Sequence, residues 1–302
     1  MGPRGVITAL LTPIDRHGHL DQEVLRLIVR RSRQQGVAGV VLGGTTGEGA
    51  FLPRHLRREA LRVVAEERAT LAFWVGIQEC NAESIQEIAQ EAKDYGADAV
   101  VTAPPYYEQL TESEILHFYE TIASELNLDV VLYHIPSRTK NPIPLNVVQM
   151  LAAHARIIGI KDSSDDLGYF REVRQRSNAS FRCWTGFSRT IPETVQLGGD
   201  GTICAAANFF PTEVVATWTW ASHRSEKSPE SFQLLKDLEG MARIHGGVRL
   251  WKAVAEILLG ITIFPISPLL PLGDSPRKEL RQILEKYPSA SVLTPPPGET
   301  AR

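Results

Sequence analysis

Cysteine is scarce in this sequence, and its few cysteines form no pattern that binds a metal. Cys80, Cys183 and Cys204 are far apart, and their spacing matches no zinc site. An odd and sparse set of thiols is typical of a protein kept in a reducing compartment. We therefore expect no metal site and a cytoplasmic location.

The sequence also lacks a charge excess and a long apolar run. It has 32 Lys and Arg against 35 Asp and Glu, a formal net charge of -3, so no basic field for nucleic acid is indicated. The longest apolar stretch, at residues 257–270, is broken by Gly260, Pro265 and Pro268. The first residues, Met-Gly-Pro-Arg-Gly, lack the apolar core of a signal peptide. We expect no nucleic-acid partner and no association with a membrane.

The sequence does contain a regular alternation of short apolar segments with longer amphipathic ones. Its composition, with 43% hydrophobic and 22% charged residues, is ordinary for a globular protein. Segments typical of buried strands are residues 5–11, 38–42, 71–77, 97–102, 129–133, 157–161, 181–184 and 201–204. Helical patterns follow these strands, several beginning at a capping residue such as Asp21, Asn81 or Thr111.

Eight strand–helix units, recurring about every 20 to 35 residues, predict an α/β protein with a (β/α)8 TIM barrel. The alternative is an open doubly wound sheet, which would carry a phosphate-binding fingerprint after its first strand. The sequence has Thr12-Pro13 there instead, so we favour the barrel.

Only helical patterns follow residue 210. They lie at residues 211–222, 229–244, 248–259 and 276–286. We therefore predict a barrel over residues 1–222, a small helical C-terminal extension over 223–293, and a disordered tail over 294–302.

The sixth expected strand, Ile157 to Ile160, leads directly into Lys161 and Asp162. A run this apolar indicates a strand buried on both faces. An ammonium group in apolar surroundings loses hydration, which favours the neutral amine. A neutral amine can attack a ketone and form a Schiff base. On this hexapeptide alone, the alternative is a lysine that simply begins a solvated loop.

In a TIM barrel the active site lies at the carboxyl ends of the strands. The residues placed there are Thr45, Thr46, Tyr106, Tyr107, Tyr133, Arg138, Lys161, Gly201 and Ile203. This set of an amine, phenols, hydroxyls and a guanidinium suits a carbonyl substrate that also carries a carboxylate.

Each of these residues also has a structural interpretation. Tyr106 and Tyr107 could be a packing pair, Tyr133 a structural strand residue, and Arg138 a surface charge. Three aspartates after the sixth strand (Asp162, Asp165 and Asp166) could suggest a metal, but they share one short loop without partners. Their joint placement at one end of one barrel favours the catalytic interpretation.

These motifs resemble the dihydrodipicolinate synthase / N-acetylneuraminate lyase family of class I pyruvate-dependent aldolases. The resemblance runs from Gly5 to about residue 285. The motifs that carry it are Gly44-Thr-Thr-Gly-Glu48, Pro105-Tyr-Tyr107, Tyr133-His-Ile-Pro-Ser-Arg138, Gly159-Ile-Lys-Asp162 and Gly198-Gly-Asp-Gly201 with Ile203.

The resemblance implies a role for each matching residue. Lys161 would form the Schiff base with pyruvate or a 2-keto acid, and Tyr133 would act as the acid and base. Gly44, Thr45 and Thr46 would form the loop that binds the pyruvate carboxylate, with Thr45 also in a proton relay. Tyr107 would reach a neighbouring subunit's site, Arg138 would bind the carboxylate of aspartate semialdehyde, and the backbone at Ile203 would contact pyruvate. The resemblance implies no cofactor and no metal. It also implies a homotetramer built as a dimer of dimers.

Several positions depart from the synthase pattern of the family. Asp162-Ser163-Ser164 follows the lysine, as in sugar-acid aldolases and dehydratases, where synthases usually have Glu-Ala. Glu108 and Lys140 replace a usual asparagine and glycine, and Ser84 replaces an acid typical of lysine-inhibited synthases. We expect these changes to lie where the second substrate binds.

The sequence therefore predicts a Schiff-base lyase acting on pyruvate, with 4-hydroxy-tetrahydrodipicolinate synthase, an enzyme of lysine biosynthesis, as the first named activity. A 2-keto-3-deoxy sugar-acid aldolase or dehydratase is the alternative within the family. From other classes, the alternatives are a non-catalytic regulator that binds a keto acid and a metal-dependent barrel hydrolase.

Overall fold

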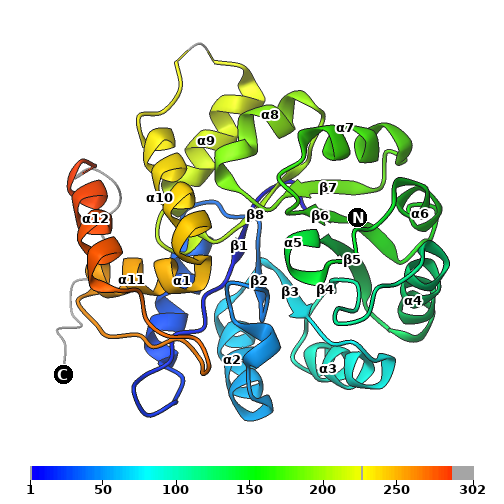
Figure 1. Cartoon of the computed structure of the whole chain (residues 1–302), viewed down its shortest axis with the longest axis horizontal. Helices are drawn as coiled ribbons and strands as arrows, with labels where there is room; N and C mark the ends of the chain where they lie inside the picture. Colours follow the sequence, from blue (N-terminus) through cyan, green and yellow to red (C-terminus); the bar gives the residue numbers. More distant parts are fainter. Residues whose placement is uncertain (1, 226, 288–302) are drawn as a thin grey trace.

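A computed structural model describes residues 2–225 and 227–287 and confirms the predicted barrel (Figure 1). Its eight parallel strands pair in sequence order, and β8 pairs back with β1 to close the barrel. The strands are β1 (Gly5–Ala9), β2 (Gly39–Leu42), β3 (Ala72–Ile77), β4 (Ala99–Thr102), β5 (Asp129–His134), β6 (Ile157–Asp162), β7 (Arg182–Thr185) and β8 (Gly201–Cys204).

Helices follow the strands and surround the barrel, with three short 3-10 turns among them (Figure 1). The barrel helices are α1 (Gln22–Gln34), α2 (Arg54–Glu67), α3 (Ala82–Asp94), α4 (Glu112–Glu125), α5 (Pro136–Thr139), α6 (Leu145–Leu151), α7 (Leu167–Arg176), α8 (Ile191–Gln196) and α9 (Pro211–His223). The 3-10 turns are η1 (Gly49–Phe51), η2 (Ser188–Thr190) and η3 (Ala206–Asn208). No helix in the described ranges combines the length and apolar character needed to cross a lipid bilayer.

The predicted helix starts are real caps. The side chains of Asp21 and Asn81 accept hydrogen bonds from the backbone N–H groups of Val24 and Ser84. Thr111 and Glu114 form the reciprocal capping box that begins α4. Each cap satisfies a backbone donor that the first turn of a helix leaves free, so these residues fix where the helices begin.

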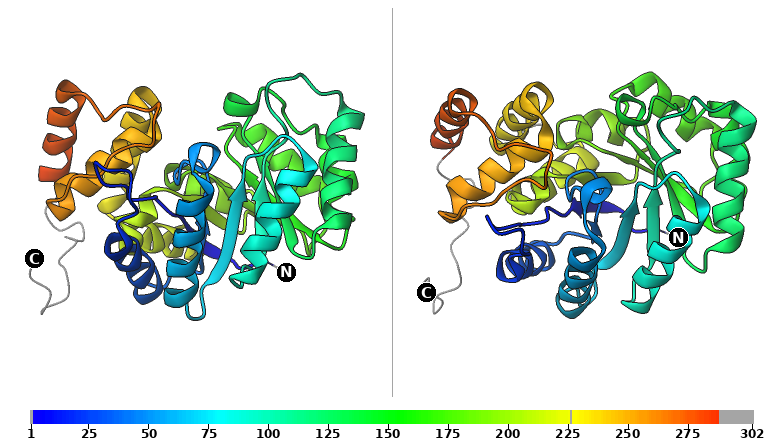
Figure 2. Two further views of the ribbon diagram at one scale, coloured as in Figure 1. Left: turned by 90° about the horizontal axis from the view of Figure 1, so that it is seen from below. Right: turned by 60° about the horizontal axis from the view of Figure 1, so that its bottom comes forward.

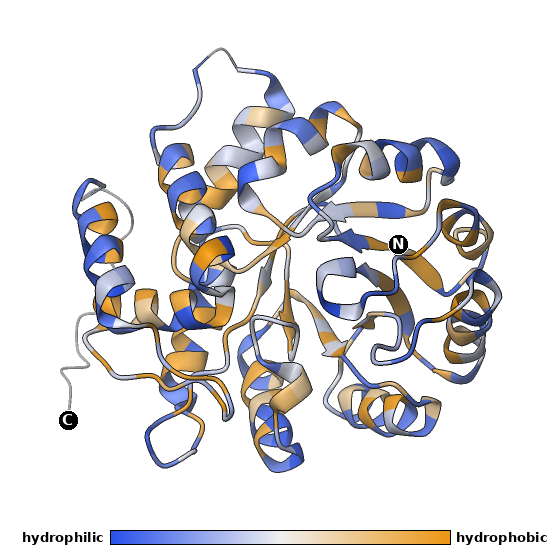
Figure 3. Cartoon of the chain, viewed as in Figure 1, coloured by the Kyte–Doolittle hydropathy of each residue, from blue (hydrophilic) through white to orange (hydrophobic). Residues whose placement is uncertain are grey.

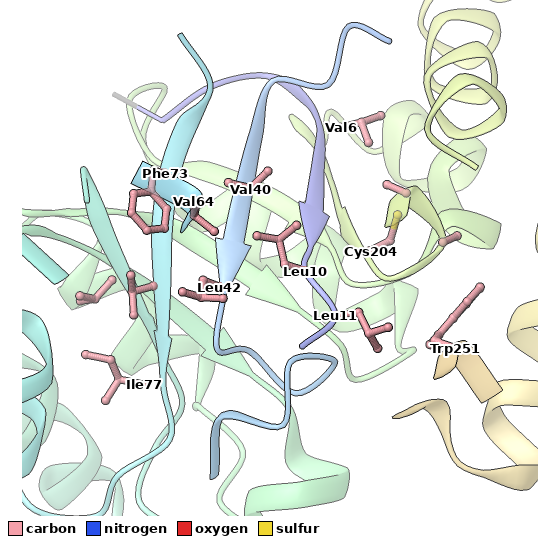
Figure 4. Close-up of a cluster of buried hydrophobic side chains, with 14 of the residues drawn as sticks. Val6, Leu10, Leu11, Val40, Leu42, Val64, Phe73, Ile77, Cys204 and Trp251 are labelled. Atoms are coloured by element: carbon pink, nitrogen blue, oxygen red, sulfur yellow. The ribbon is translucent and has the colours of Figure 1, made fainter. Parts of the chain in front are cut away.

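The hydrophobic core has two layers separated by the barrel wall. The outer layer packs the strands against the surrounding helices, whose inner faces are apolar and outer faces polar (Figure 3). Figure 4 shows part of it, with Val6, Val40 and Phe73 from the first three strands and Trp251 from the C-terminal helices. Alternate residues on each strand point inward instead, so Ile7 belongs to the inner layer.

The inner layer fills the barrel and reaches its mouth. Trp74 and Trp184 meet edge to face, with ring centroids 5.1 Å apart. Tyr133 belongs to the same inward-facing cluster and is 3% exposed. The barrel interior is therefore a packed core, with a cavity at the carboxyl ends of its strands.

Three further helices, α10 (Ser231–His245), α11 (Gly247–Leu259) and α12 (Asp274–Glu285), follow the barrel. In the left view of Figure 2 they lie at the upper edge of the molecule, and the N-terminus lies below. Side chains of α10 and α11 share a cavity with residues at the strand ends, so these helices cover part of the barrel mouth. The predicted tail over 294–302 and the end of the predicted extension lie outside the described residues.

Candidate active site

The pairing of β5 with β6 places the expected amine beside the expected phenol. Tyr133 and Lys161 are register partners on these neighbouring strands. Both side chains are buried, and the Lys161 Nζ atom lies 4.3 Å from the centre of the Tyr133 ring. In the described part of the chain, Lys161 forms no ion pair with a carboxylate. Its amine therefore rests on an aromatic face without a counter-ion.

The Tyr133 hydroxyl lies at the centre of a small polar network. It is 3.2 Å from the Thr45 hydroxyl. Burial alone would raise the pKa of Tyr133. The charge of Lys161 and hydrogen bonds with Thr45, Ser163 and Lys161 outweigh that effect and lower this pKa from its ordinary value. The phenol is therefore adjusted for proton transfer, the use expected for it.

The loop after β2 holds Thr45 and Thr46 at the barrel mouth. Gly43 begins the loop in a left-handed conformation, at φ +71°, which glycine adopts without strain. The Thr12 hydroxyl donates to the Gly47 carbonyl at 2.7 Å, and the Gly49 N–H donates to the Gly44 carbonyl at 3.1 Å. These bonds fix the loop so that both threonines face the cavity.

A cavity of about 530 Å³ joins most of the predicted residues. Of the ten residues predicted at the site, six line it: Thr45, Thr46, Tyr133, Arg138, Lys161 and Ile203. A second cavity of about 360 Å³ shares Thr45, Tyr133 and Arg138 with it, so the two meet at the phenol. These volumes are in the range of sites for small metabolites.

Tyr106 lines the smaller cavity, whereas Gly44, Tyr107 and Gly201 line neither. Gly201 begins β8, so it lies at the opposite end of that strand from the mouth. Gly44 is buried within the loop and serves its shape. Tyr107 lines neither cavity, and its side chain is 96% exposed. Its expected service to a neighbouring subunit stays a prediction.

Sequence reasoning missed a buried ion pair behind the threonine loop. Glu48 and Lys252 are both almost fully buried and form a direct ion pair. Glu48 also accepts from the N–H of Ile266, and Lys252 donates to the Phe264 carbonyl at 2.6 Å. Burial raises the pKa of Glu48 and lowers that of Lys252, and each partner opposes the shift of the other. The pair ties the loop to the C-terminal helices.

Ser163 was expected only as one of the departures from the synthase pattern and Gly186 was not predicted; both line the larger cavity. Ser163 lines the cavity and bonds the Tyr133 hydroxyl. Gly186 faces it from the end of β7, where a Cβ atom would collide with the Ser163 hydroxyl. A hydroxyl two residues after the strand-end lysine was the available signal for Ser163.

Asp162 does not face the substrate, which corrects the expectation that it lies at the second-substrate end. Successive strand residues point to opposite faces, so Asp162 turns outward while Lys161 turns inward. Burial raises the pKa of Asp162 to about 7. Its neighbour His134 is stacked on Tyr169, and burial lowers the pKa of His134 to about 4.

Of the remaining departures from the synthase pattern, Ser163 and Ser164 line the larger cavity, which agrees with the expectation. Ser84, Glu108 and Lys140 line neither of the two cavities at the mouth, which corrects it. Among residues 2–225 and 227–287, no three His, Cys, Asp or Glu side chains are grouped to hold a metal ion. That no cofactor is required stays a prediction.

Fold and site together define a (β/α)8-barrel lyase with a buried lysine and tyrosine at its mouth. The model of the Dihydrodipicolinate synthetase family matches residues 2–287, and the chain belongs to that family. An uncharacterized DapA-like lyase of Pyrococcus abyssi is 30% identical over 88% of this chain and 90% of its own. The 4-hydroxy-tetrahydrodipicolinate synthase of Staphylococcus haemolyticus is 30% identical over 95% of this chain and 98% of its own.

Solved structures of the family have the same fold. YagE, a prophage protein of Escherichia coli K12 solved in complex with pyruvate, superposes with a TM-score of 0.86 at 25% identity, over 94% of this chain and 98% of its own. Dihydrodipicolinate synthase of Aquifex aeolicus gives a TM-score of 0.88 at 25% identity, over 95% of this chain and 99% of its own.

Proposed function

We propose that the protein is a class I lyase that forms a Schiff base between Lys161 and the ketone of pyruvate or a 2-keto acid. The observation that carries this proposal is the position of the Lys161 Nζ atom, buried on the ring of Tyr133 and unpaired with any carboxylate of residues 2–225 and 227–287. A lysine so placed is positioned to attack a ketone. A protein that only binds a keto acid has no need of this pairing.

The chemistry follows from the side chains in the cavity. The amine lone pair bonds to the ketone carbon, the ketone oxygen takes a proton, and loss of water gives a protonated imine. In the cleavage direction, a hydroxyl two carbons away gives its proton to Tyr133 and becomes an aldehyde. The electrons of the broken carbon–carbon bond pass to the imine and form an enamine. Protonation of the enamine carbon and hydrolysis then release pyruvate and restore Lys161.

The remaining residues supply binding. Thr45 and Thr46 hold the pyruvate carboxylate at the loop after β2, and Thr45 connects its hydroxyl with that of Tyr133. The imine itself accepts the electrons, so the reaction needs no cofactor. Tyr107 is exposed and so is available to a neighbouring subunit. The proposed enzyme is a homotetramer that works in the cytoplasm.

Borohydride trapping tests this mechanism. The protein is incubated with pyruvate, reduced and weighed, and one pyruvate adduct is expected on Lys161. Lys161→Ala removes the adduct, whereas Lys140→Ala, which changes a lysine outside both cavities, retains it. An unmodified wild-type protein after reduction contradicts the mechanism.

Arg138 favours aspartate semialdehyde as the second substrate, which makes 4-hydroxy-tetrahydrodipicolinate synthase one candidate. Arg138 lines both cavities beside Tyr133 and can pair with the semialdehyde carboxylate. Arg138→Ala then weakens condensation by about 2–5 kcal/mol, because a desolvated carboxylate loses its partner. A negligible effect counts against the synthase.

Ser163 and Ser164 favour a second candidate, the cleavage or dehydration of 2-keto-3-deoxy sugar acids. Both hydroxyls line the cavity, which continues past Arg138 to the C-terminal helices. Hydroxyl groups suit a hydroxylated chain better than the aldehyde of the synthase reaction. Condensation with aspartate semialdehyde, measured beside pyruvate release from 2-keto-3-deoxy acids, separates the two candidates.

A further inference from the structure

The outer wall of the larger cavity carries a cluster of charged side chains that the imine chemistry does not use. Arg189 in η2 and Arg243 in α10 both approach one oxygen of Asp165, in the loop after β6. The Asp165 Oδ2 atom is 2.7 Å from Arg189 Nη2 and 3.8 Å from Arg243 Nη1. All three residues line the same cavity as Lys161. The cluster therefore lies within reach of a substrate that extends outward from the imine.

Arg189 is held more firmly than a surface arginine. Glu239, a buried carboxylate in α10, accepts from the N–H and hydroxyl of Ser188, each at 2.7 Å, and from the N–H of Arg189 at 3.1 Å. The Arg189 guanidinium lies over the ring of Phe187, 4.6 Å from its centre. A planar guanidinium fixed on an aromatic ring can bind a carboxylate or phosphate through two parallel bonds. Glu239 and Phe187 thus position Arg189 at the cavity wall.

Asp165 is held less firmly than the arginine it pairs with. Its backbone has a φ of +67°, which is uncommon for a residue with a side chain, and its side chain is 33% exposed. The carboxylate is therefore at the surface of the cavity, on a loop whose conformation is strained. A substrate anion could take its place on Arg189 with little loss of packing.

The charges of the cavity wall determine how a second acidic group could bind. Lys161, Arg138, Arg189 and Arg243 line the cavity, against the carboxyl groups of Asp165 and Glu239. At the outer end Arg189 and Arg243 are balanced by Asp165 and Glu239, so the excess of the whole cavity comes from Lys161 and Arg138. An acidic group at the far end of the substrate would therefore have to take the place of Asp165 on Arg189.

We propose that Arg189, supported by Arg243, binds a second acidic group at the end of the substrate remote from the ketone, and that Asp165 occupies this position when no substrate is bound. The proposal rests on the lyase function proposed above and narrows its substrates to 4-hydroxy-2-keto acids with a terminal carboxylate or phosphate. Arg138 lies in α5 on another part of the wall, so its partner and that of Arg189 are distinct.

The test uses six-carbon 2-keto-3-deoxy acids that differ only in the last group: hydroxyl, carboxylate or phosphate. We expect the wild type to release pyruvate from an acidic substrate with a kcat/KM about 10- to 100-fold above that for the neutral one. The preferred acidic group identifies the ligand as a carboxylate or a phosphate. Equal rates on all three substrates overturn the proposal.

Variants assign the preference to Arg189. Arg189→Gln lowers kcat/KM for the acidic substrate by about 10- to 100-fold and leaves the neutral substrate within about twofold. Arg189→Lys retains part of the preference, and Asp165→Asn lowers KM for the acidic substrate, because a competing anion is gone. Arg176→Gln removes an exposed ion pair with Glu172 outside the cavity and serves as the control. Equal losses on acidic and neutral substrates mean a structural role and refute the proposal.

Borohydride trapping with pyruvate separates this specificity proposal from the Schiff-base mechanism on which it rests. Arg189→Gln should trap pyruvate on Lys161 as the wild type does, because pyruvate does not extend to the outer wall. If the wild type traps pyruvate but shows no preference for an acidic end, only the specificity proposal fails. If the wild type traps no pyruvate, the proposed function fails.

Discussion

Lys161 and Lys252 are both buried near the mouth of the barrel, and their surroundings differ in one respect. Lys252 is paired with the carboxylate of Glu48 and donates to a backbone carbonyl. Lys161 has the ring of Tyr133 beneath it and neutral hydroxyls near it, with no carboxylate partner in the described residues. A carboxylate stabilises the ammonium form and makes a lysine structural. A buried lysine without one is open to reaction, so the missing counter-ion marks the nucleophile better than burial does.

Replacing each lysine by methionine tests this difference, and the change at Lys161 should have the largest effect on turnover. Lys161→Met keeps the side-chain length and removes the amine, so turnover should fall about 10⁴-fold or more, as for loss of a nucleophile. The free energy of unfolding should stay the same or rise, because no ion pair is broken. Steady-state kinetics and urea unfolding measure the two quantities. A large loss of stability without loss of turnover would reverse the assigned roles.

Lys252→Met should produce the opposite result. It leaves the Glu48 carboxylate buried without its partner, and such a change lowers the free energy of unfolding by about 3–5 kcal/mol. Pyruvate should still be trapped on Lys161 in the fraction that remains folded. The double variant Glu48→Gln/Lys252→Met removes both charges and should regain much of the lost stability. A single variant as stable as the wild type would contradict a paired Lys252.

Asp162 extends the comparison to a buried acid that has no cationic partner among the residues the structure describes. Its pKa of about 7 in the folded state lies above the usual value of 3.8. The folded protein therefore binds more protons than the unfolded chain between about pH 4 and 7, so stability falls as the pH rises through this window. Asp162→Asn should remove that loss and be more stable than the wild type by about 2–4 kcal/mol at pH 8, with little difference at pH 4.

Urea unfolding at several pH values checks the Asp162 prediction. Both proteins keep His134, whose pKa of about 4 lies below the usual 6.5, so its contribution to stability falls in both as the pH falls from about 6.5 towards 4 and cancels in the difference between them. Parallel curves for wild type and variant over the whole range would contradict a raised Asp162 pKa. Because Asp162 faces away from the cavity, the ratio of activities on the two candidate substrates should not change.

Much of the fold could be predicted from the sequence because buried parallel strands form uninterrupted apolar runs. All eight strands were predicted, with their ends displaced by a residue or two, as at His134 and Thr185. The short helix α5 was not predicted, since its four residues, Pro136 to Thr139, are too few to show a helical period. The predicted and observed elements therefore agree where burial alone determines which residue types a segment contains.

The site was predictable where strand ends alone determine it. Lys161, Tyr133 and Thr45 were found because the barrel rule brings the carboxyl ends of all strands together. The pair of Glu48 and Lys252 was not found, because its members come from elements far apart in sequence and no local pattern connects them. The outward direction of Asp162 was available from strand alternation, but its proximity to Lys161 suggested a shared role.

Ser163→Ala tests the neutral hydroxyls that surround Lys161 and Tyr133, and it should have the smallest effect on turnover. The Ser163 hydroxyl bonds the Tyr133 hydroxyl and helps to lower the pKa of that phenol. Losing one such bond costs about 1 kcal/mol, or about a fivefold fall in kcat. The Tyr133 ionisation in the pH–rate profile should also move to higher pH, because the phenolate loses a donor. Ser164→Ala is the matched control for the pH–rate profile only, since that hydroxyl lines the same cavity but accepts from the Asp166 N–H at 3.1 Å, and it should leave the Tyr133 ionisation unshifted. A fall of 100-fold or more would show that Ser163 itself transfers a proton, whereas an unshifted profile would show that Thr45 and Lys161 alone adjust the phenol beside the unpaired lysine.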